Sequence, residues 1–305
     1  MRGLLLWCAQ NRWLAAHVPR WGFARRAVKR FLPGEQFEAA VQVAIAFKAD
    51  GIGSLFTRLG ENVENLSEAR AVVEHYESVF AKLVESGLEA EVSVKPTQLG
   101  LDVDAKAAYA NLERLADAAE KARSFLWIDM EGSAYTEPTL DLYRRLRAKH
   151  PRTGVALQAY LHRTVEDVAQ LLPLEPAIRL VKGAYSEPAD RAYTDTRDVD
   201  ANYLALSALM LPELKRGKLR LVLGTHDVEL IARATGFARA LGIELSRMEV
   251  NMLYGIRTDQ QVRLAKEGYV VKALIAYGDA WYAWYLRRLA ERPANMMFVA
   301  RQLLP

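Results

Sequence analysis

Short apolar runs alternate with longer amphipathic stretches along the chain beyond Gly51. The short runs favour strands, and the longer ones, rich in Ala, Leu, Glu and Arg, are typical of amphipathic helices. This alternation indicates repeated βα units around a parallel sheet. The predicted strands are Gly53–Leu59, Ala90–Leu99, Phe125–Gly132, Gly154–Leu161, Ala177–Tyr185, Leu219–Asp227, Met248–Gly255 and Val270–Gly278. The predicted helices are Leu66–Ser86, Asp104–Ala122, Pro138–Lys149, Val165–Leu172, Asp198–Leu214, Val228–Leu241, Thr258–Lys266 and Asp279–Arg292.

Eight consecutive βα units predict a (β/α)8 barrel of the TIM type, distorted, with residues 51–305 as one catalytic domain. Residues 1–50 are predicted to form an N-terminal helical arm. No linker rich in Gly or Ser divides the series. An open doubly wound sheet would show a similar alternation and stays open as the alternative fold.

Polar residues at the C-terminal ends of the predicted strands favour the barrel. In a barrel, catalytic groups lie where each strand runs into the following loop, so these residues would converge on one mouth. A purely structural role would require several half-buried ion pairs, which is costly by desolvation. The polar strand-end residues are Lys95, Asp129, Glu131, Gln158, Arg179, Lys182, Thr225, His226, Asp227, Glu249 and Asn251.

Composition limits the setting in which the chain works. Of its 305 residues, 51% are hydrophobic and 26% are charged, which suffices for one large buried core. The single Cys8 cannot form an intramolecular disulfide or a paired-thiolate metal site, which favours a reducing, cytoplasmic location. The apolar run after Met1 stops at Gln10, well short of the roughly 18 residues that a bilayer span needs. We therefore expect a soluble protein.

The formal net charge is +4, and basic residues gather near the N-terminus together with aromatic ones. Such a segment could make a peripheral contact with the inner face of a membrane. A helical arm packed on the barrel, with solvated basic faces, is the other interpretation. No nucleic-acid partner is expected, because no recognised module surrounds these charges. The residues concerned are Trp7, Arg12, Trp13, Arg20, Trp21, Phe23, Arg25, Arg26, Lys29 and Arg30.

Common ligand-binding motifs are absent from the sequence. It contains neither the GxGxxG dinucleotide fingerprint after the first strand nor a GxxxxGK[ST] phosphate loop. It has no HExxH or paired-cysteine motif, so no metal is predicted. Any cofactor must be held by scattered residues.

The segment from Arg179 to Tyr185, R-L-V-K-G-A-Y, resembles the signature on the fifth strand of the proline dehydrogenase family. That family includes monofunctional bacterial enzymes and the proline dehydrogenase domain of bifunctional proline utilisation proteins. Six blocks in register carry far more weight than one. The other five are Ser93–Lys95, Trp127–Glu131, Leu157–Tyr160, Gly224–His226 and Leu286–Pro293, all within the stretch from Gly53 to Asn295.

The resemblance implies a bound FAD, with Arg179 beside the flavin N5 edge and Gln158 near its pyrimidine side. A cation near N5 stabilises the negative charge that develops on the ring as hydride arrives, and Gly183 lets the backbone approach a ligand closely. Taken alone, Gly183 would be a plain turn and His226 a structural histidine. The implied contacts with the flavin or its phosphate-ribose tail are Met130, Val181, Lys182, Gly183, Ala184, Thr225 and His226.

The resemblance also implies a clamp for the substrate carboxylate, made of Lys95, Arg287 and Arg288, with Asp129 beside Lys95. Asp129 and Arg179 are the implied catalytic residues. Guanidinium groups bind a carboxylate bidentately and fix its orientation. As a bare dibasic pair, Arg287 and Arg288 would ordinarily be solvated surface.

Geometry restricts how this clamp can form. Arg287 lies nine positions beyond Gly278, which is roughly 13 Å along a helix. Both arginines reach the pocket only if the last helix lies over the barrel mouth. Glu291 falls on the same helical face and could balance the arginines or face the substrate nitrogen, or it could form a surface pair.

The resemblance adds pocket walls and a gate. Tyr185, Leu253 and Trp284 are the implied walls around the substrate. Glu61 matches a loop glutamate that pairs with the first arginine and closes the site, which would shield the reduced flavin. Glu64 is a nearby alternative for this role.

The last predicted strand departs from the family pattern. Leu274 stands where relatives have a tyrosine that packs on the substrate ring. The smaller side chain leaves space for a hydroxyl, although it offers no hydrogen bond, so a preference for hydroxyproline is open. Tyr277 could compensate only if the predicted register is wrong.

The implied reaction is oxidation of L-proline to Δ1-pyrroline-5-carboxylate, with hydride passing from C5 to flavin N5 and electrons then to a membrane quinone. We expect a separate pyrroline-5-carboxylate dehydrogenase to act next, because no aldehyde dehydrogenase domain is expected in this chain. Because Lys95 and Lys182 both end strands, a Schiff-base lyase or aldolase is a rival hypothesis. A catalytically silent amino-acid-binding barrel is another.

Overall fold

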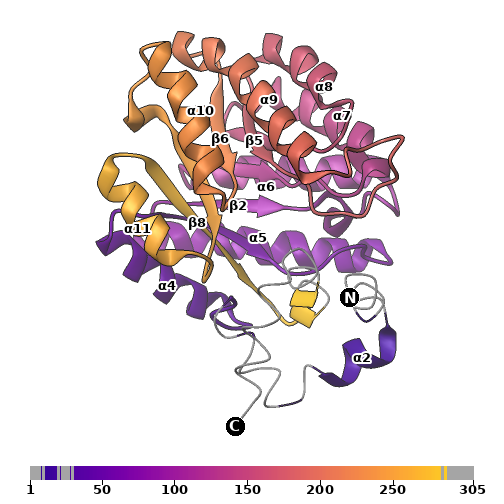
Figure 1. Ribbon diagram of the computed structural model, residues 1–305. Coiled ribbons are helices and arrows are strands. Elements are labelled where there is room, and N and C mark those ends of the chain that lie inside the picture. The colour runs from indigo at the N-terminus through magenta and orange to yellow at the C-terminus, as the bar shows by residue number, and fades with distance from the viewer. Residues whose placement is uncertain are drawn as a thin grey trace.

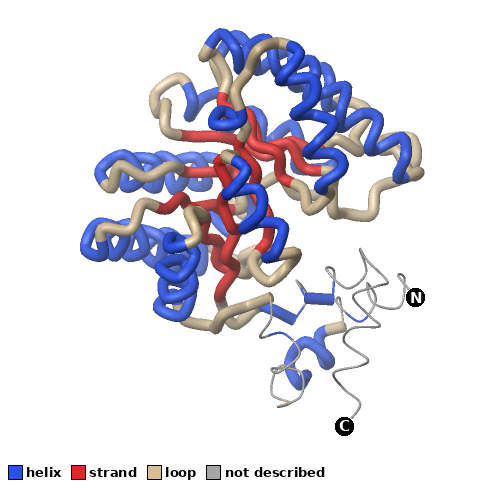
Figure 2. Tube along the Cα trace, turned by 60° about the vertical axis from the view of Figure 1, so that its left-hand side comes forward, coloured by secondary structure: helices blue, strands red, loops and turns tan. Residues whose placement is uncertain are grey.

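The computed structural model describes residues 31–282, together with residues 8, 11–18, 21, 28, 285 and 286. Among them, eight parallel strands form a closed barrel in chain order, with helices around it (Figures 1 and 2). Closure is direct, because β1 pairs with β8 from Gly53↔Lys272 to Arg58↔Tyr277. This confirms the predicted barrel and excludes the open sheet. The strands are β1 Gly53–Arg58, β2 Ala90–Val94, β3 Leu126–Ile128, β4 Thr153–Gln158, β5 Ala177–Val181, β6 Arg220–Gly224, β7 Glu249–Leu253 and β8 Val270–Tyr277.

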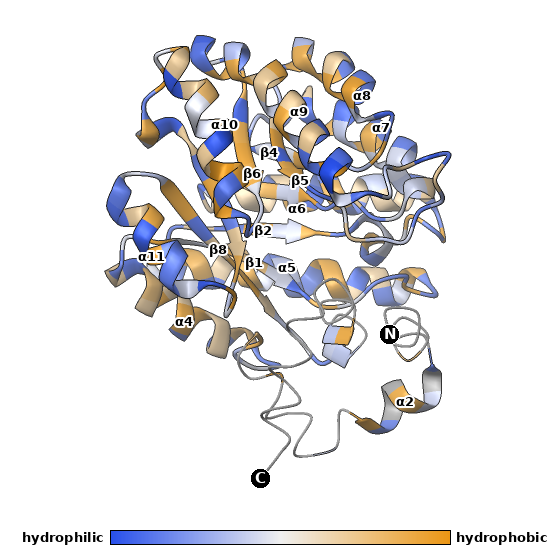
Figure 3. Cartoon of the chain, in the orientation of Figure 1, coloured by the Kyte–Doolittle hydropathy of each residue, from blue (hydrophilic) through white to orange (hydrophobic). Residues whose placement is uncertain are grey.

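Helices follow the strands and turn their apolar faces toward them, while polar residues face outward (Figure 3). Asp104, Asp195 and Asp227 accept hydrogen bonds from first-turn N–H groups and so fix the starts of α6, α9 and α10. The helices described are α2 Arg12–His17, α4 Phe37–Ala49, α5 Leu66–Ser86, α6 Ala105–Lys121, α7 Thr136–Arg147, α8 Thr164–Leu171, α9 Thr196–Arg216, α10 Val228–Ala240 and α11 Thr258–Glu267. The helix predicted over Asp279–Arg292 lies largely outside the described residues.

Every predicted strand overlaps an observed one, but each prediction continued too far at the C-terminal end. After β2, for example, a 3-10 helix at Pro96–Leu99 takes the chain out of the sheet. Proline has no N–H for the ladder, and its fixed φ suits the start of a helical turn. The apolar signal continues into these segments because they line the mouth instead of extending the strands.

Inside the barrel, alternate strand residues form layers, as expected for this fold. Leu55, Trp127, Ala177 and Val222 make a small apolar cluster in the interior. A Cβ at Gly154 would lie 2.5 Å from the Trp127 ring, so glycine is needed there. The interior is therefore a packed core that supports the mouth from below.

Charged residues fill the base of the barrel, at the N-terminal ends of the strands. Glu91 accepts from Arg220 at 2.6 Å and from Lys272 at 2.7 Å, and Trp127 Nε1 donates to it at 2.7 Å. Arg220 and Lys272 also pair with Glu249, which starts β7 and therefore lies at the base, not at the mouth as predicted from the sequence. Burial opposes the charge of Glu91, but the two cations hold the pKa of its carboxyl below the ordinary value. This network closes the base and leaves the opposite end for a site.

Helix α4 covers the outer face of β1 and β8 and is buried there through Phe37, Ala40, Ala44 and Phe47. In a TIM barrel this place on the wall normally belongs to the helix that follows the last strand. The chain after β8 instead packs Trp281 against the mouth-side residues Leu59 and Ala276. The expected division of the chain at residue 50 stays a prediction. No helix in the described part of the chain is both long and apolar enough to cross a bilayer.

Candidate active site

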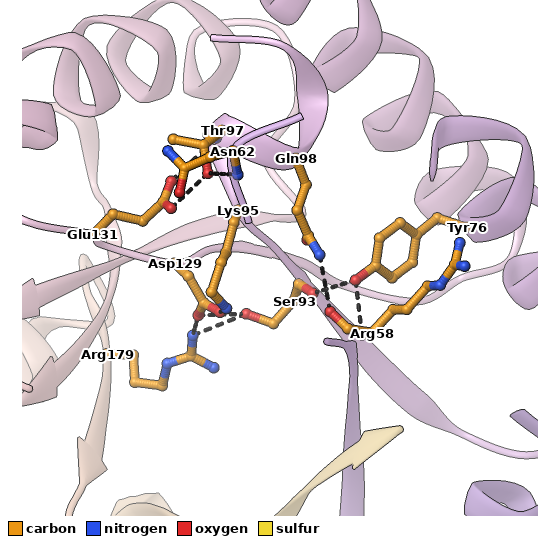
Figure 4. Close-up of polar contacts among 10 residues, drawn as sticks. All are labelled: Arg58, Asn62, Tyr76, Ser93, Lys95, Thr97, Gln98, Asp129, Glu131 and Arg179. Atoms are coloured by element: carbon orange, nitrogen blue, oxygen red, sulfur yellow. Dashed lines mark hydrogen bonds and ion pairs between the residues drawn. The ribbon is translucent and has the colours of Figure 1, made fainter. Parts of the chain in front are cut away.

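A cluster of buried charges occupies the mouth of the barrel. Lys95, at the end of β2, donates to Asp129 Oδ2 at 3.2 Å, and Arg179 from β5 pairs with Asp129 Oδ1. Ser93 Oγ donates to Asp129 Oδ1 at 2.7 Å and accepts from Arg179 Nη2 at 2.9 Å. Figure 4 shows both cations converging on Asp129, with Ser93 beside them. The structure thus brings together three residues that the sequence predicted for one site.

Mutual electrostatics keep this cluster ionised. Burial opposes the positive charge of Lys95, but Asp129 more than offsets this and holds the pKa of Lys95 above its ordinary value. Burial likewise opposes the charge of Asp129, while Lys95 and Arg179 hold the pKa of its carboxyl below the ordinary value. A lysine that stays charged can bind an acid group and is poorly suited to be a nucleophile. The arrangement therefore disfavours a Schiff-base role for Lys95.

Several polar atoms at the mouth have no hydrogen-bond partner within the described residues. They are Arg179 Nη1, Gln158 Oε1 and both amide atoms of Asn251, all on buried side chains. Buried polar atoms are nearly always paired, so an unpaired set on β4, β5 and β7 indicates a polar ligand. Donors and acceptors of this kind fit the polar edge of a flavin ring, and the residues present are therefore compatible with FAD.

The segment after β5 is shaped by Gly183. Its φ is +121°, and a Cβ there would lie 2.2 Å from the Tyr160 ring. The close approach seen at Gly183 is thus to Tyr160, and a contact with a ligand stays a prediction. Lys182 Nζ pairs with Asp200 at 2.5 Å and with Asp227 at 3.0 Å. A phosphate contact through Lys182 would have to compete with these two carboxylates.

Thr225 and His226 follow β6 and lead into the N-terminus of α10. Thr225 Oγ1 accepts from the backbone N–H of Asp227 at 3.1 Å, and His226 Nε2 accepts from Leu253 N–H at 3.4 Å. Exposed N–H groups and the helix dipole make such a terminus favourable for phosphate. Gly224 lets β6 pack closely against β5, since a Cβ there would lie 2.8 Å from Val181.

The other predicted flavin contacts lie near these residues. Val181 and Ala184 are half-buried at the end of β5 and just beyond it. Met130, which follows Asp129, is buried and belongs to the main hydrophobic core. A flavin contact for each of the three stays a prediction.

On the predicted substrate side, Tyr185 and Leu253 are half-buried at the mouth. The negative charge of Glu61, and that of Tyr185 when ionised, both favour the charged form of Lys95, which places these residues near it. Glu64 is exposed, and its N–H donates to Glu68 at 2.9 Å at the start of α5. Glu61 is therefore the better placed of the two candidate gates.

The register of β8 answers the question about Tyr277. Leu274 faces the barrel interior and packs on its apolar cluster, whereas Tyr277 faces outward and its hydroxyl lies 2.8 Å from His75 Nε2. Tyr277 therefore cannot replace the missing aromatic at Leu274. Four predicted residues lie outside the described part of the chain: Trp284, Arg287, Arg288 and Glu291.

Two residues in the site had no role assigned from the sequence. Ser93 could have been found from strand alternation, because it precedes Lys95 by two positions and so shares its face. Asn251 was visible as a polar strand end, but nothing in the sequence shows that its amide lacks partners. Outside the site, Asp117, Glu120 and His150 hold atoms that could bind a metal ion within 4.8 Å of one another. This group lies at the opposite end of the barrel, where α6 ends and β4 begins.

Comparison with known proteins assigns the chain to one family. The family model described as proline dehydrogenase matches residues 40–301. The chain belongs to the proline dehydrogenase family. It is 34% identical to Proline dehydrogenase 1 of Bacillus subtilis, across 100% of this chain and 99% of that protein. It is 37% identical to the proline dehydrogenase of Deinococcus radiodurans, across 90% of this chain and 89% of that protein.

Solved structures confirm the fold of this proline dehydrogenase family member. The crystal structure of proline utilization A from Bdellovibrio bacteriovorus aligns with a TM-score of 0.83 at 21% sequence identity. The alignment covers 99% of this chain and 38% of that one, so the chain spans well under half of that larger protein. The predictions of family and of an oxidoreductase of this family are confirmed.

Proposed function

We propose that this chain oxidises L-proline to Δ1-pyrroline-5-carboxylate with bound FAD. The observation that carries the proposal is the buried cluster of Lys95, Asp129 and Arg179, beside unpaired polar atoms on Gln158 and Asn251. It joins a fixed positive charge, which suits an amino-acid carboxylate, to a polar edge that suits a flavin. When bound, FAD would supply the acceptor, at its N5, for the hydride that leaves C5 of proline.

The residues of the chain would bind and orient the substrate. Lys95 would attract its carboxylate, together with Arg287 and Arg288 from the last helix. Asp129 would hold Lys95 and Arg179 apart and in place, since it bonds both cations at once. Tyr185 and Leu253 would confine the ring, and Glu61 would cover it and exclude water. Orientation of this kind contributes a large part of the rate of a hydride transfer.

The flavin would be held mainly on the β4 to β6 side. Arg179 and Gln158 would meet the ring, while Lys182, Thr225 and His226 would meet its phosphate-ribose tail. Met130, Val181, Gly183 and Ala184 would line the same side. An arginine at the ring edge would stabilise the charge that develops during hydride transfer.

The proposal also covers the electron acceptor and the cellular location of the reaction. We propose a membrane quinone as the electron acceptor, reached through a peripheral contact of the N-terminal segment. Trp13 in that segment is 59% exposed, which suits an interfacial position. A separate pyrroline-5-carboxylate dehydrogenase would consume the product, and the reaction would take place in the cytoplasm.

Anaerobic titration of the purified protein tests the proposal. Bound flavin should give an absorbance band at about 450 nm, and L-proline should bleach it while the protein stays folded. Titration with 4-hydroxy-L-proline in parallel measures the effect of Leu274. Stronger bleaching by hydroxyproline would reassign the substrate. A protein without flavin, or one that binds proline without bleaching, would overturn the proposal and favour the lyase or the silent binding barrel.

A further inference from the structure

Thr97 lies where three loops of the barrel mouth meet. It is fully buried in the first turn of the 3-10 helix that follows Lys95. Its Oγ1 accepts from the backbone N–H of Asn62 at 3.1 Å and donates to Glu131 Oε1 at 2.6 Å. Its own N–H donates to Glu131 Oε2 at 3.1 Å. Figure 4 shows Thr97 bridging Asn62 and Glu131 above Lys95.

The loop that carries Glu61 is fastened to this point at several places. Val63 N–H donates to Thr97 O at 3.4 Å, one residue beyond the Asn62 bond. Gln98 Nε2 donates to the backbone carbonyl of Arg58 at 3.1 Å, just before the loop. These bonds join the loop after β1 to the turn after β2.

Asn62 holds an unusual backbone conformation in this loop. Its φ is +51°, in the left-handed region that few residues other than glycine adopt and that asparagine tolerates better than most. The Asn62 side chain donates to Asp102 at 2.9 Å and to Tyr135 at 3.3 Å, which secures this conformation. A residue held in this way indicates a loop whose shape is fixed by its neighbours.

On the other side, Glu131 extends the connection toward β4. Its backbone carbonyl accepts from Gln158 Nε2 at 2.7 Å, which leaves Gln158 Oε1 as one of the unpaired atoms of the mouth. Glu131 is 3% exposed and among the described residues its carboxylate is bonded by Thr97. The rim from Asn62 to Gln158 is thus one hydrogen-bonded unit across four strand ends.

We propose that Thr97 is a positioning residue that holds the Glu61 loop and Lys95 in the geometry needed to bind substrate. The inference rests on the proposed function and deepens it. Glu61 immediately precedes Asn62, and Lys95 precedes Thr97 by two residues, so both move if the Thr97 hydroxyl is lost. Glu61 and Glu131 also act electrostatically on Lys95. Displacement of this rim weakens the binding of substrate more than it slows the reaction of the bound substrate.

Two substitutions at Thr97 separate hydrogen bonding from shape. Thr97→Val keeps the shape and removes the hydroxyl, whereas Thr97→Ser keeps the hydroxyl and removes a methyl group. Thr97→Val should raise the KM for proline about tenfold, with kcat changed by less than about twofold, because it removes interactions that position the bound substrate. Thr97→Ser should restore a KM within about threefold of the parent value.

Amide hydrogen exchange gives a readout that does not depend on turnover. The N–H groups of Asn62 and Val63 both donate to Thr97. Thr97→Val should speed exchange in a peptide covering residues 60–65, and Thr97→Ser should not. Thr235→Val is the matched control, because Thr235 is a buried threonine on α10 whose hydroxyl donates to Ile231 O at 2.8 Å. It should leave KM and this peptide unchanged.

The outcomes separate this inference from the proposed function. A parent protein that proline does not reduce refutes the proposed function. An active parent whose Thr97→Val variant keeps its KM and its exchange rate refutes the role of Thr97 alone. If Thr97→Val does not fold, Thr97→Ala replaces it, since alanine also removes the hydroxyl that bonds Asn62 N–H and Glu131 and adds no bulk. Unchanged exchange and KM in that variant would refute the positioning role.

Discussion

Arg179 and Asp129 form an ion pair inside the barrel although they are 50 positions apart in the sequence. They come from β5 and from the end of β3, with β4 between them, so the pair reaches across the interior. The Arg179 side chain is only 5% exposed, and its guanidinium lies 5.1 Å from the centre of the Trp127 ring. The packed layer below the mouth thereby fixes a cation that has one nitrogen left for a ligand.

Replacement of Asp129 tests how far this pair controls the site. Asp129→Asn leaves Lys95 and Arg179 without their shared counter-charge, so burial then favours a neutral Lys95. We expect kcat/KM for proline to fall about 100-fold and the free energy of unfolding to fall by about 3 kcal/mol, as for other broken buried pairs. Steady-state kinetics and urea denaturation measure the two effects.

Asp141→Asn is the control for this change. Asp141 pairs with Arg145 on the exposed face of α7, and neither residue belongs to the cluster around Asp129. It should leave both quantities nearly unchanged. An Asp129→Asn enzyme with parental kcat/KM would show that the carboxylate has no part in catalysis or binding.

The sequence predicted the barrel well because its signal is repetitive. Eight apolar runs separated by helical spacing can be recognised even where single boundaries are wrong, and a closed barrel accounts for polar residues that recur at the ends of successive strands. Lys95, Asp129 and Arg179 were found for this reason. The ends of the strands were missed because Pro96 and Gly183 turn the chain at the mouth while the apolar composition continues.

Other features depend on contacts that no local pattern records. The outward direction of Tyr277 follows from its packing on α4 and its bond to His75, both distant in sequence. Thr97 connects Asn62, 35 positions before it, to Glu131, 34 positions after it. A single threonine in the sequence gives no sign of this connection. Sequence alone therefore predicts which residues share the mouth and not how they are connected.

Glycine at position 183 is required by both space and backbone conformation. Gly183→Ala would place a Cβ 2.2 Å from the Tyr160 ring at a φ of +121°. We expect the free energy of unfolding to fall by about 3 kcal/mol, together with a loss of bound flavin. Gly217→Ala is the matched control, because its φ is +76° and nothing lies within 4 Å of its Cβ. It should cost about 1 kcal/mol. Equal losses in the two variants, measured by urea denaturation, would show that contact with Tyr160 is unimportant.

The charged base of the barrel should matter for stability and not for turnover. Glu91→Gln removes one of the two carboxylates that pair with Arg220 and Lys272. Only Glu249 then remains as their shared partner. We expect a loss of about 3 kcal/mol in the free energy of unfolding, since a buried charge loses its partner. The kcat should stay within about twofold of the parent value, because the base lies at the end opposite to the mouth. Glu267→Gln, in an exposed pair with Arg263, should change neither quantity. A large fall in kcat for Glu91→Gln would contradict this separation.

His75 should make the fold sensitive to mild acid. Burial, with the nearby charges of Arg58 and Lys82, lowers the pKa of His75 from 6.5 to about 4. Between these values the unfolded chain binds a proton that the folded chain does not, so the free energy of unfolding falls as pH falls from about 6.5 toward 4. Allowing for partial exposure, we expect about 1 kcal/mol between pH 6.5 and 5. His75→Gln keeps a partner for Tyr277 and cannot titrate, so it should be less sensitive by that amount in urea denaturation across this range. Parallel curves for the two proteins would show that His75 is free to take up a proton in the folded state.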